Sequence, residues 1–164
     1  MSIEADSLPG DGRNETLNER MDRNWNEILQ ELRVIQTGTQ ILTGFLLAVA
    51  FQQRFEDLDR FQVSVYLVLV ALSVLATLLA LAPVSLHRTL FRKRAKPEIV
   101  RAANRLVQLT LVVVALTLAG TALLIFDFVV GRSAGLAAGA VTAVVALLLW
   151  GLLPLVIRRN DVGA

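Results

Sequence analysis

The stretch Phe61–Ala82, FQVSVYLVLVALSVLATLLALA, decides the fold. It is apolar over 22 residues, and a helix of this length crosses the ~30 Å hydrocarbon core of a bilayer. Three further apolar blocks follow the same pattern, and the charged residues gather in the gaps between them. The predicted spans are about 34–51, 61–83, 106–130 and 135–157. The predicted fold class is an all-α membrane protein, a four-transmembrane-helix bundle.

Proline and glycine residues, which disfavour helix, mark the expected helix ends and kinks. We expect Pro83 to close the second span, residues 131–134 to form a tight turn, and Gly151 and Pro154 to kink the fourth span. Residues 52–60 are expected to be a short loop whose acids, from Glu56 to Asp59, are solvated.

The first and third helices are expected to extend into the cytoplasm. Thr16 and Glu19 have the spacing of a capping box, which predicts a helix start. One apolar stripe then follows, at Met21, Trp25, Ile28, Leu32 and Ile35. Residues 15–33 are therefore predicted to form an amphipathic cytoplasmic helix continuous with the first span. A disordered tail is expected over 1–14 and a C-terminal tail over 158–164. Pro97 followed by Glu98 predicts the start of the third helix.

Basic residues predict the orientation. Four of the 16 Lys and Arg residues lie before the first span, seven in the central loop and two in the C-terminal tail, whereas only Arg54, Arg60 and Arg132 lie on the other side. This asymmetry predicts that both termini and the central loop lie in the cytoplasm. We expect the membrane to be the plasma (inner) membrane. No cleavable signal peptide is expected in Met1–Asn14, so the first helix would act as the insertion signal.

Uncharged polar residues distinguish the first span. Gln36, Gln40 and Thr43 are costly against lipid, so they should face protein or water. They line a hydrophilic pathway, or they form hydrogen bonds between helices.

Two titratable residues lie in or beside the spans. Asp127 lies near the outer end of the third span, where it is an ion-pair partner of Arg132 or Arg54, or a proton or sodium site. The absence of a carboxylate near the bilayer middle argues against an antiporter built on a central acid. His87, at the inner interface, is a pH sensor or a solvated side chain.

Charge complementarity predicts a cytoplasmic stalk. Glu27 and Glu31 of the first helix are positioned to pair with Arg101 and Arg105 of the third. The basic central loop is also suited to binding anionic lipid headgroups. In the fourth helix Gly131, Gly135 and Gly139 form a row of small residues that predicts close packing against another helix.

Several classes of function are excluded on sequence grounds. The chain has no Cys and one His, so neither a thiolate nor a histidine metal cluster is expected. We find no phosphate-binding glycine loop, no Ser/His/Asp set and no paired carboxylates in a span. No enzyme activity, cofactor or nucleic-acid partner is expected.

A family resemblance covers about residues 15–157. The motif Glu-Thr-Leu-Asn-Glu-Arg-Met from Glu15, the later Gln36-Thr37-Gly38 and Gly44-Phe45-Leu46, and the pairs Ala82-Pro83 and His87-Arg88 carry it. The chain resembles a bacterial family of small four-span membrane proteins of unknown function, some of which are named sodium:proton antiporters. The resemblance implies a membrane location and implies transport only loosely.

Two functions remain open on this basis. The first is passage of a small cation or proton through a homo-oligomer, with Gln36, Gln40 and Thr43 on the path. The second is a non-transporting membrane scaffold or partner-binding protein.

Overall fold

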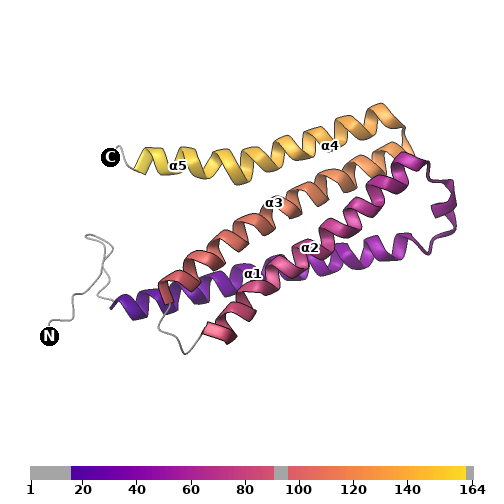
Figure 1. The fold of residues 1–164 in the computed structure, drawn as a ribbon. Coiled ribbons are helices and arrows are strands. Elements are labelled where there is room, and N and C mark those ends of the chain that lie inside the picture. Colours follow the sequence, from indigo (N-terminus) through magenta and orange to yellow (C-terminus); the bar gives the residue numbers. More distant parts are fainter. Residues whose placement is uncertain (1–15, 91–95, 162–164) are drawn as a thin grey trace. The chain divides into compact units, whose positions relative to one another are not determined.

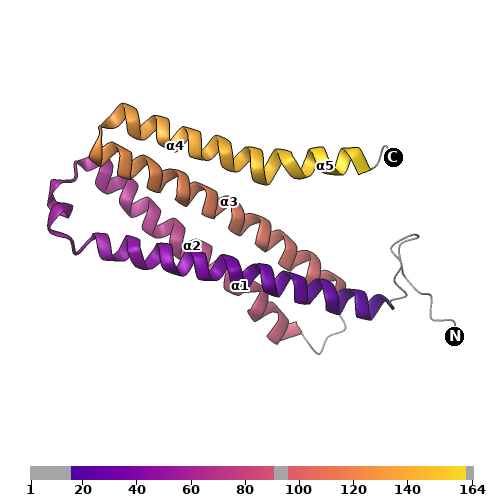
Figure 2. The ribbon, with the colours of Figure 1, turned by 180° about the vertical axis from the view of Figure 1, so that it is seen from behind.

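The computed structural model describes residues 16–90 and 96–161 (Figures 1 and 2), and the regular structure in these ranges is helical. The elements are α1 (Leu17–Val49), the 3-10 helix η1 (Gln53–Asp57), α2 (Arg60–Leu90), α3 (Lys96–Val129), α4 (Arg132–Leu147), the π-helix η2 (Leu148–Leu152) and α5 (Leu153–Asp161). The helical stretches long and apolar enough to cross a membrane are Asp22–Val49, Arg60–Leu86, Arg101–Val129 and Arg132–Ile157. The prediction of an all-α fold with four membrane-length helices is confirmed.

The capping box at the start of α1 is also confirmed. The Thr16 backbone N–H and hydroxyl both donate to Oε2 of Glu19, each at 2.8 Å, and the Glu19 N–H donates back to the Thr16 hydroxyl oxygen at 3.4 Å. The bonds that Thr16 donates, first from its backbone and then from its side chain, lower the pKa of the Glu19 carboxyl. From this cap α1 continues without a break to Val49.

The prediction that the second helix ends at Pro83 is wrong. The helix continues to Leu90 with Pro83 inside it. Proline supplies no N–H to the carbonyl of Leu79 and crowds it. Pro83 is nevertheless fully buried, and a membrane-length helix tolerates an internal proline because neighbouring groups compensate for the missing bond.

The turn between α3 and α4 is shorter than predicted. Only Val130 and Gly131 separate the two helices, so α4 begins at Arg132 instead of Gly135. Gly131 has φ +128°, a backbone conformation that favours glycine. This single left-handed residue reverses the chain without a longer loop.

Near Gly151 and Pro154, where a kink is expected, the structure has the π-helix η2. The Leu153 N–H bonds to the Leu148 carbonyl, five residues back, which widens the helix just before the proline. Such π-turns are one of the recognised causes of helix bending.

By their internal contacts the residues divide into two compact units, which we describe separately. Unit 1 comprises Met1–Gly38 and Thr77–Thr110, and unit 2 comprises Thr39–Ala76 and Leu111–Ala164. The buried core of unit 1 contains Ile28, Leu32, Ala80, Ala103 and Val107. The stripe predicted on α1 therefore supplies two of the most buried side chains of this unit.

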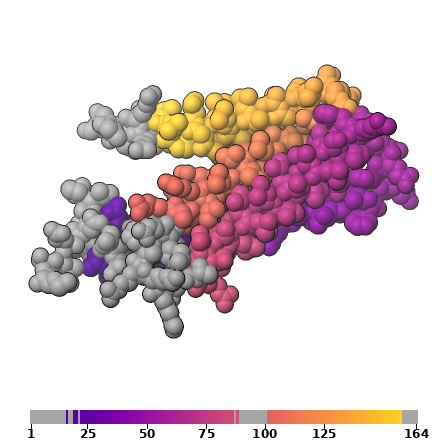
Figure 3. Space-filling model, in the orientation of Figure 1, coloured from indigo at the N-terminus to yellow at the C-terminus, as the bar shows by residue number. Residues whose placement is uncertain are grey.

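Unit 2 has its core in Leu46, Tyr66, Leu69 and Leu124. The Tyr66 hydroxyl donates to the Leu46 carbonyl at 2.9 Å, which ties α2 to α1. Gly120 of α3 lies so close to Leu69 that a Cβ there would be 2.6 Å from Leu69 Cδ2. Along α4 only Gly135 and Gly139 are buried, and its large apolar side chains are exposed. In the space-filling view α4 is the orange segment (Figure 3).

Candidate functional site

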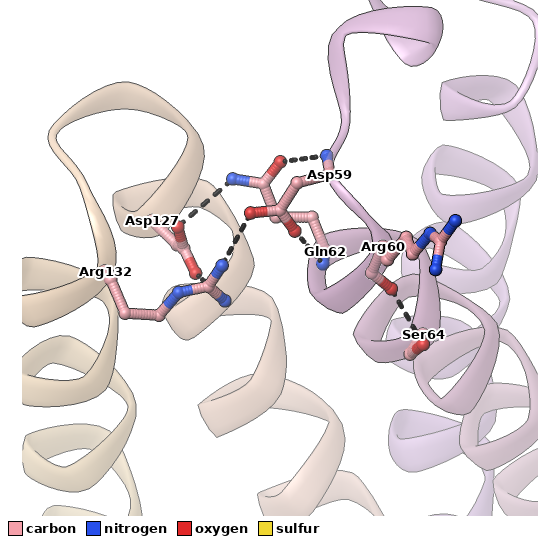
Figure 4. Close-up of polar contacts among 6 residues, drawn as sticks. All are labelled: Asp59, Arg60, Gln62, Ser64, Asp127 and Arg132. Atoms are coloured by element: carbon pink, nitrogen blue, oxygen red, sulfur yellow. Dashed lines mark hydrogen bonds and ion pairs between the residues drawn. The ribbon is translucent and has the colours of Figure 1, made fainter.

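Four polar side chains of unit 2 meet where α2 begins and where α3 turns into α4. They are Asp59, Gln62, Asp127 and Arg132, and we call them the polar ring (Figure 4). Neighbouring Arg60 points away from them, and its carbonyl accepts the Ser64 hydroxyl at 2.8 Å.

The first half of the polar ring is a second capping box. Asp59 precedes the first residue of α2, and the Gln62 N–H donates to its Oδ1 at 2.8 Å. In return the Asp59 N–H donates to Gln62 Oε1 at 3.0 Å. The expectation that Asp59 is merely solvated was wrong, and its spacing from Gln62, the same as between Thr16 and Glu19, was the available signal.

The second half fixes Asp127 at both carboxylate oxygens. Gln62 Nε2 donates to Oδ1 at 3.1 Å, and Arg132 Nη1 lies 2.9 Å from Oδ2. The second contact is ionic, since Oδ2 has no well-aligned hydrogen-bond donor among the described residues. Arg132 Nη2 closes the ring with a 2.6 Å bond to Asp59 Oδ2.

Burial makes these contacts matter. The Asp127 side chain is 4% exposed, whereas those of Arg132 and Asp59 are 41% and 52% exposed. The Arg132 guanidinium also lies 3.8 Å from the centroid of the Phe61 ring, a cation–π contact that holds its plane. A buried carboxylate is costly unless it is paired, and here Arg132 and Gln62 supply the compensation.

Glycines allow α4 to approach the ring. A Cβ on Gly135 would lie 2.6 Å from Asp127 Cβ and 2.8 Å from the Leu123 carbonyl oxygen. A Cβ on Gly139 would lie 3.0 Å from Leu123 Cβ. The partner of these two glycines is therefore α3 of the same chain. Gly131 has no such neighbour within 4 Å and serves the turn instead.

The geometry favours the ion-pair interpretation of Asp127. Two carboxylates share one guanidinium, and the buried one is contacted at each oxygen. Arg54, the other proposed partner, lies 4.7 Å from the Phe128 ring centroid and pairs with Asp57 at 3.4 Å. The polar ring thus joins α2, α3 and α4.

The polar residues of the first span are not brought into this ring. Gln36 is half-buried in unit 1, and Gln40 is exposed in unit 2. The Thr43 hydroxyl donates to the Thr39 carbonyl of its own helix at 2.7 Å. Their role in a pathway stays a prediction.

The stalk also stays a prediction. Glu27 pairs with Arg23, one turn away in α1, at 3.0 Å. Glu31, Arg101 and Arg105 are exposed. The His87 side chain and residues 91–95 of the basic loop lie outside the described part of the chain.

In its described residues the protein is all-helical, with four helices long and apolar enough to cross a membrane. The chain belongs to a family of unknown function (DUF6328), whose model matches residues 14–154. Searches of the curated proteins and of the solved structures found no match. The expected membership in a family of unknown function is confirmed.

Proposed function

We propose that this protein acts as a homo-oligomer in the plasma membrane and passes a small cation or proton along a path lined by α1. The observation that carries the proposal is the exposure of Gln40 in the apolar half of α1.

Gln40 lies nine residues before the end of α1, about 13 Å along the helix axis. Its side chain has no hydrogen-bond partner among the described residues. Its neighbours three and four positions along the helix are polar or small, namely Gln36, Thr37, Thr43 and Gly44, while the nearby Ile41 and Phe45 are 58% and 69% exposed. An amide against hydrocarbon is costly. A second copy of α1, or water enclosed by several copies, would supply the missing partners.

The orientation proposed is both termini and the central loop in the cytoplasm. The excess of Lys and Arg on that side supports it. The polar ring then lies at the outer end of the helices, and the capped start of α1 lies inside.

The proposed path does not require a carboxylate that binds and releases a proton. Asp127 is contacted at both oxygens in the polar ring, so it is poorly placed to release and bind a proton in each cycle. Amide oxygens such as that of Gln40 would replace part of the hydration shell of a passing cation.

One observation favours the alternative, a non-transporting membrane scaffold. The Thr43 hydroxyl is already satisfied within α1 and does not need a water-filled path. In this alternative Gln40 is a contact between copies and nothing more.

Ion flux in liposomes tests the proposal. Purified protein is reconstituted, proton, sodium and potassium gradients are imposed in turn, and a pH-sensitive dye is followed. We expect flux above empty liposomes, a loss of most of it in Gln40→Leu, and little change in Gln108→Leu, a matched change at an exposed glutamine of α3. Absence of flux under every gradient, from protein of native helicity, would support the scaffold.

A further inference from the structure

Unit 2 contains a half-open cavity of about 560 Å³ between α1, η1 and α3. This volume is in the range of ~300–1,000 Å³ typical of small-molecule sites. Its walls include Leu42, Phe45, Leu124, Ile125 and Phe128. The cavity begins beside η1 and reaches Leu42, seven residues into α1 from Val49, which is about 10 Å along the axis.

The inner surface of the cavity offers no free polar group. Two hydroxyl-bearing residues line it, and both hydroxyls are engaged by backbone carbonyls: Tyr66 with Leu46 at 2.9 Å, and Thr121 with Thr117 at 2.7 Å. The Phe55 ring meets the edge of Tyr66 at 5.1 Å between centroids. Such a cavity does not suit water or an ion but suits a hydrocarbon chain.

The rim has the opposite character. We take as the rim the remaining polar residues of the lining, Gln52, Gln53 and Arg54, because they directly follow α1 and residues just beyond a span lie near the headgroups. The Arg54 side chain is 76% exposed, and its contact with Asp57 at 3.4 Å engages only Nε. Stacking on Phe128 holds the guanidinium at the cavity, with terminal N–H donors left for a phosphate.

We propose that the cavity holds one acyl chain of a membrane phospholipid, with the lipid phosphate at Arg54. The apolar interior, its depth along α1 and the Arg54 guanidinium at the rim together select this occupant. The lipid site does not depend on ion permeation, so each of the two proposals can be refuted without affecting the other.

Native mass spectrometry of delipidated protein in detergent tests the proposal, with phosphatidylglycerol as the probe. Wild type should bind one phosphatidylglycerol in a saturable manner. Ile125→Trp, which fills the cavity, should weaken binding at least about tenfold, whereas Phe126→Trp, an exposed neighbour outside the cavity, should not. Equal binding by these two variants, or no saturable adduct on wild type, would overturn the proposal.

The rim is tested by a surface change that leaves packing intact. Arg54→Gln should weaken phosphatidylglycerol binding about tenfold, the worth of one charge-assisted hydrogen bond, and Arg60→Gln should not. Diacylglycerol, which lacks the phosphate, should bind both variants equally. Tighter binding of palmitate than of phosphatidylglycerol would assign the cavity to a free fatty acid and refute the phospholipid.

Discussion

At the scale of single residues, Asp127 shows how a charge is tolerated within a membrane-length helix. The carboxylate is almost fully buried, and Gln62 and Arg132 each contact one of its oxygens. Arg132 is itself held by Asp59 and Phe61. Removing one of these side chains leaves a buried charge without its partner. The resulting loss of folding free energy is larger than the net stabilisation that the intact pair provides.

Arg132→Gln should lower the free energy of unfolding by about 2 kcal/mol, less than for a fully buried pair because Arg132 is partly exposed. The measurement is reversible unfolding in mixed micelles followed by circular dichroism. Arg60→Gln is the matched control, since Arg60 points away from the polar ring (Figure 4) and should change the free energy by less than ~0.5 kcal/mol. Equal stability of the two variants would show that the ring contributes nothing.

At the scale of elements, the approach of α4 to α3 depends on Gly135. Its missing Cβ makes room for the Asp127 side chain and the Leu123 carbonyl. A backbone oxygen at 2.8 Å cannot move aside cheaply, so the two helices would have to separate to admit even a methyl group.

Gly135→Ala should therefore destabilise the protein by about 1–3 kcal/mol. Gly38→Ala is the contrasting change, because nothing lies within 4 Å of a Cβ there. Alanine is the better helix former, so Gly38→Ala should be neutral or stabilising by up to ~1 kcal/mol. Thermal denaturation in detergent compares them, and a Gly135→Ala variant as stable as Gly38→Ala would contradict the packing described.

Local signals in the sequence were sufficient to predict most of the elements. Four apolar blocks gave the helices, and the Thr16–Glu19 spacing gave the start of α1. The end of α2 was mispredicted at Pro83, because proline usually breaks a helix but here is buried within unit 1, where the packing keeps the helix intact. Only part of the polar ring could be predicted from the sequence, because Asp59 and Arg132, which are in contact, are 73 positions apart in the chain.

At the scale of the whole molecule, the exposed surfaces differ in chemistry. The exposed side of α4 carries apolar residues such as Val141 and Val144, as a lipid-facing helix should. The exposed side of α1 carries Gln40 and, one turn away, Gly44, where a Cβ would have no neighbour within 4 Å. A polar amide beside a small residue is typical of a helix that meets another helix, and the proposed homo-oligomer places this side of α1 between copies.

Disulfide cross-linking in native membranes tests this central claim most directly, because the chain has no cysteine of its own. Gly44→Cys keeps Gln40 in place and sets a thiol on the same side of α1, five residues before its end. Ala137→Cys is the matched control, exposed on α4 five residues from its start. On oxidation the account predicts a covalent dimer for Gly44→Cys and a monomer for Ala137→Cys. Monomers for both variants, or equal amounts of dimer, would contradict it.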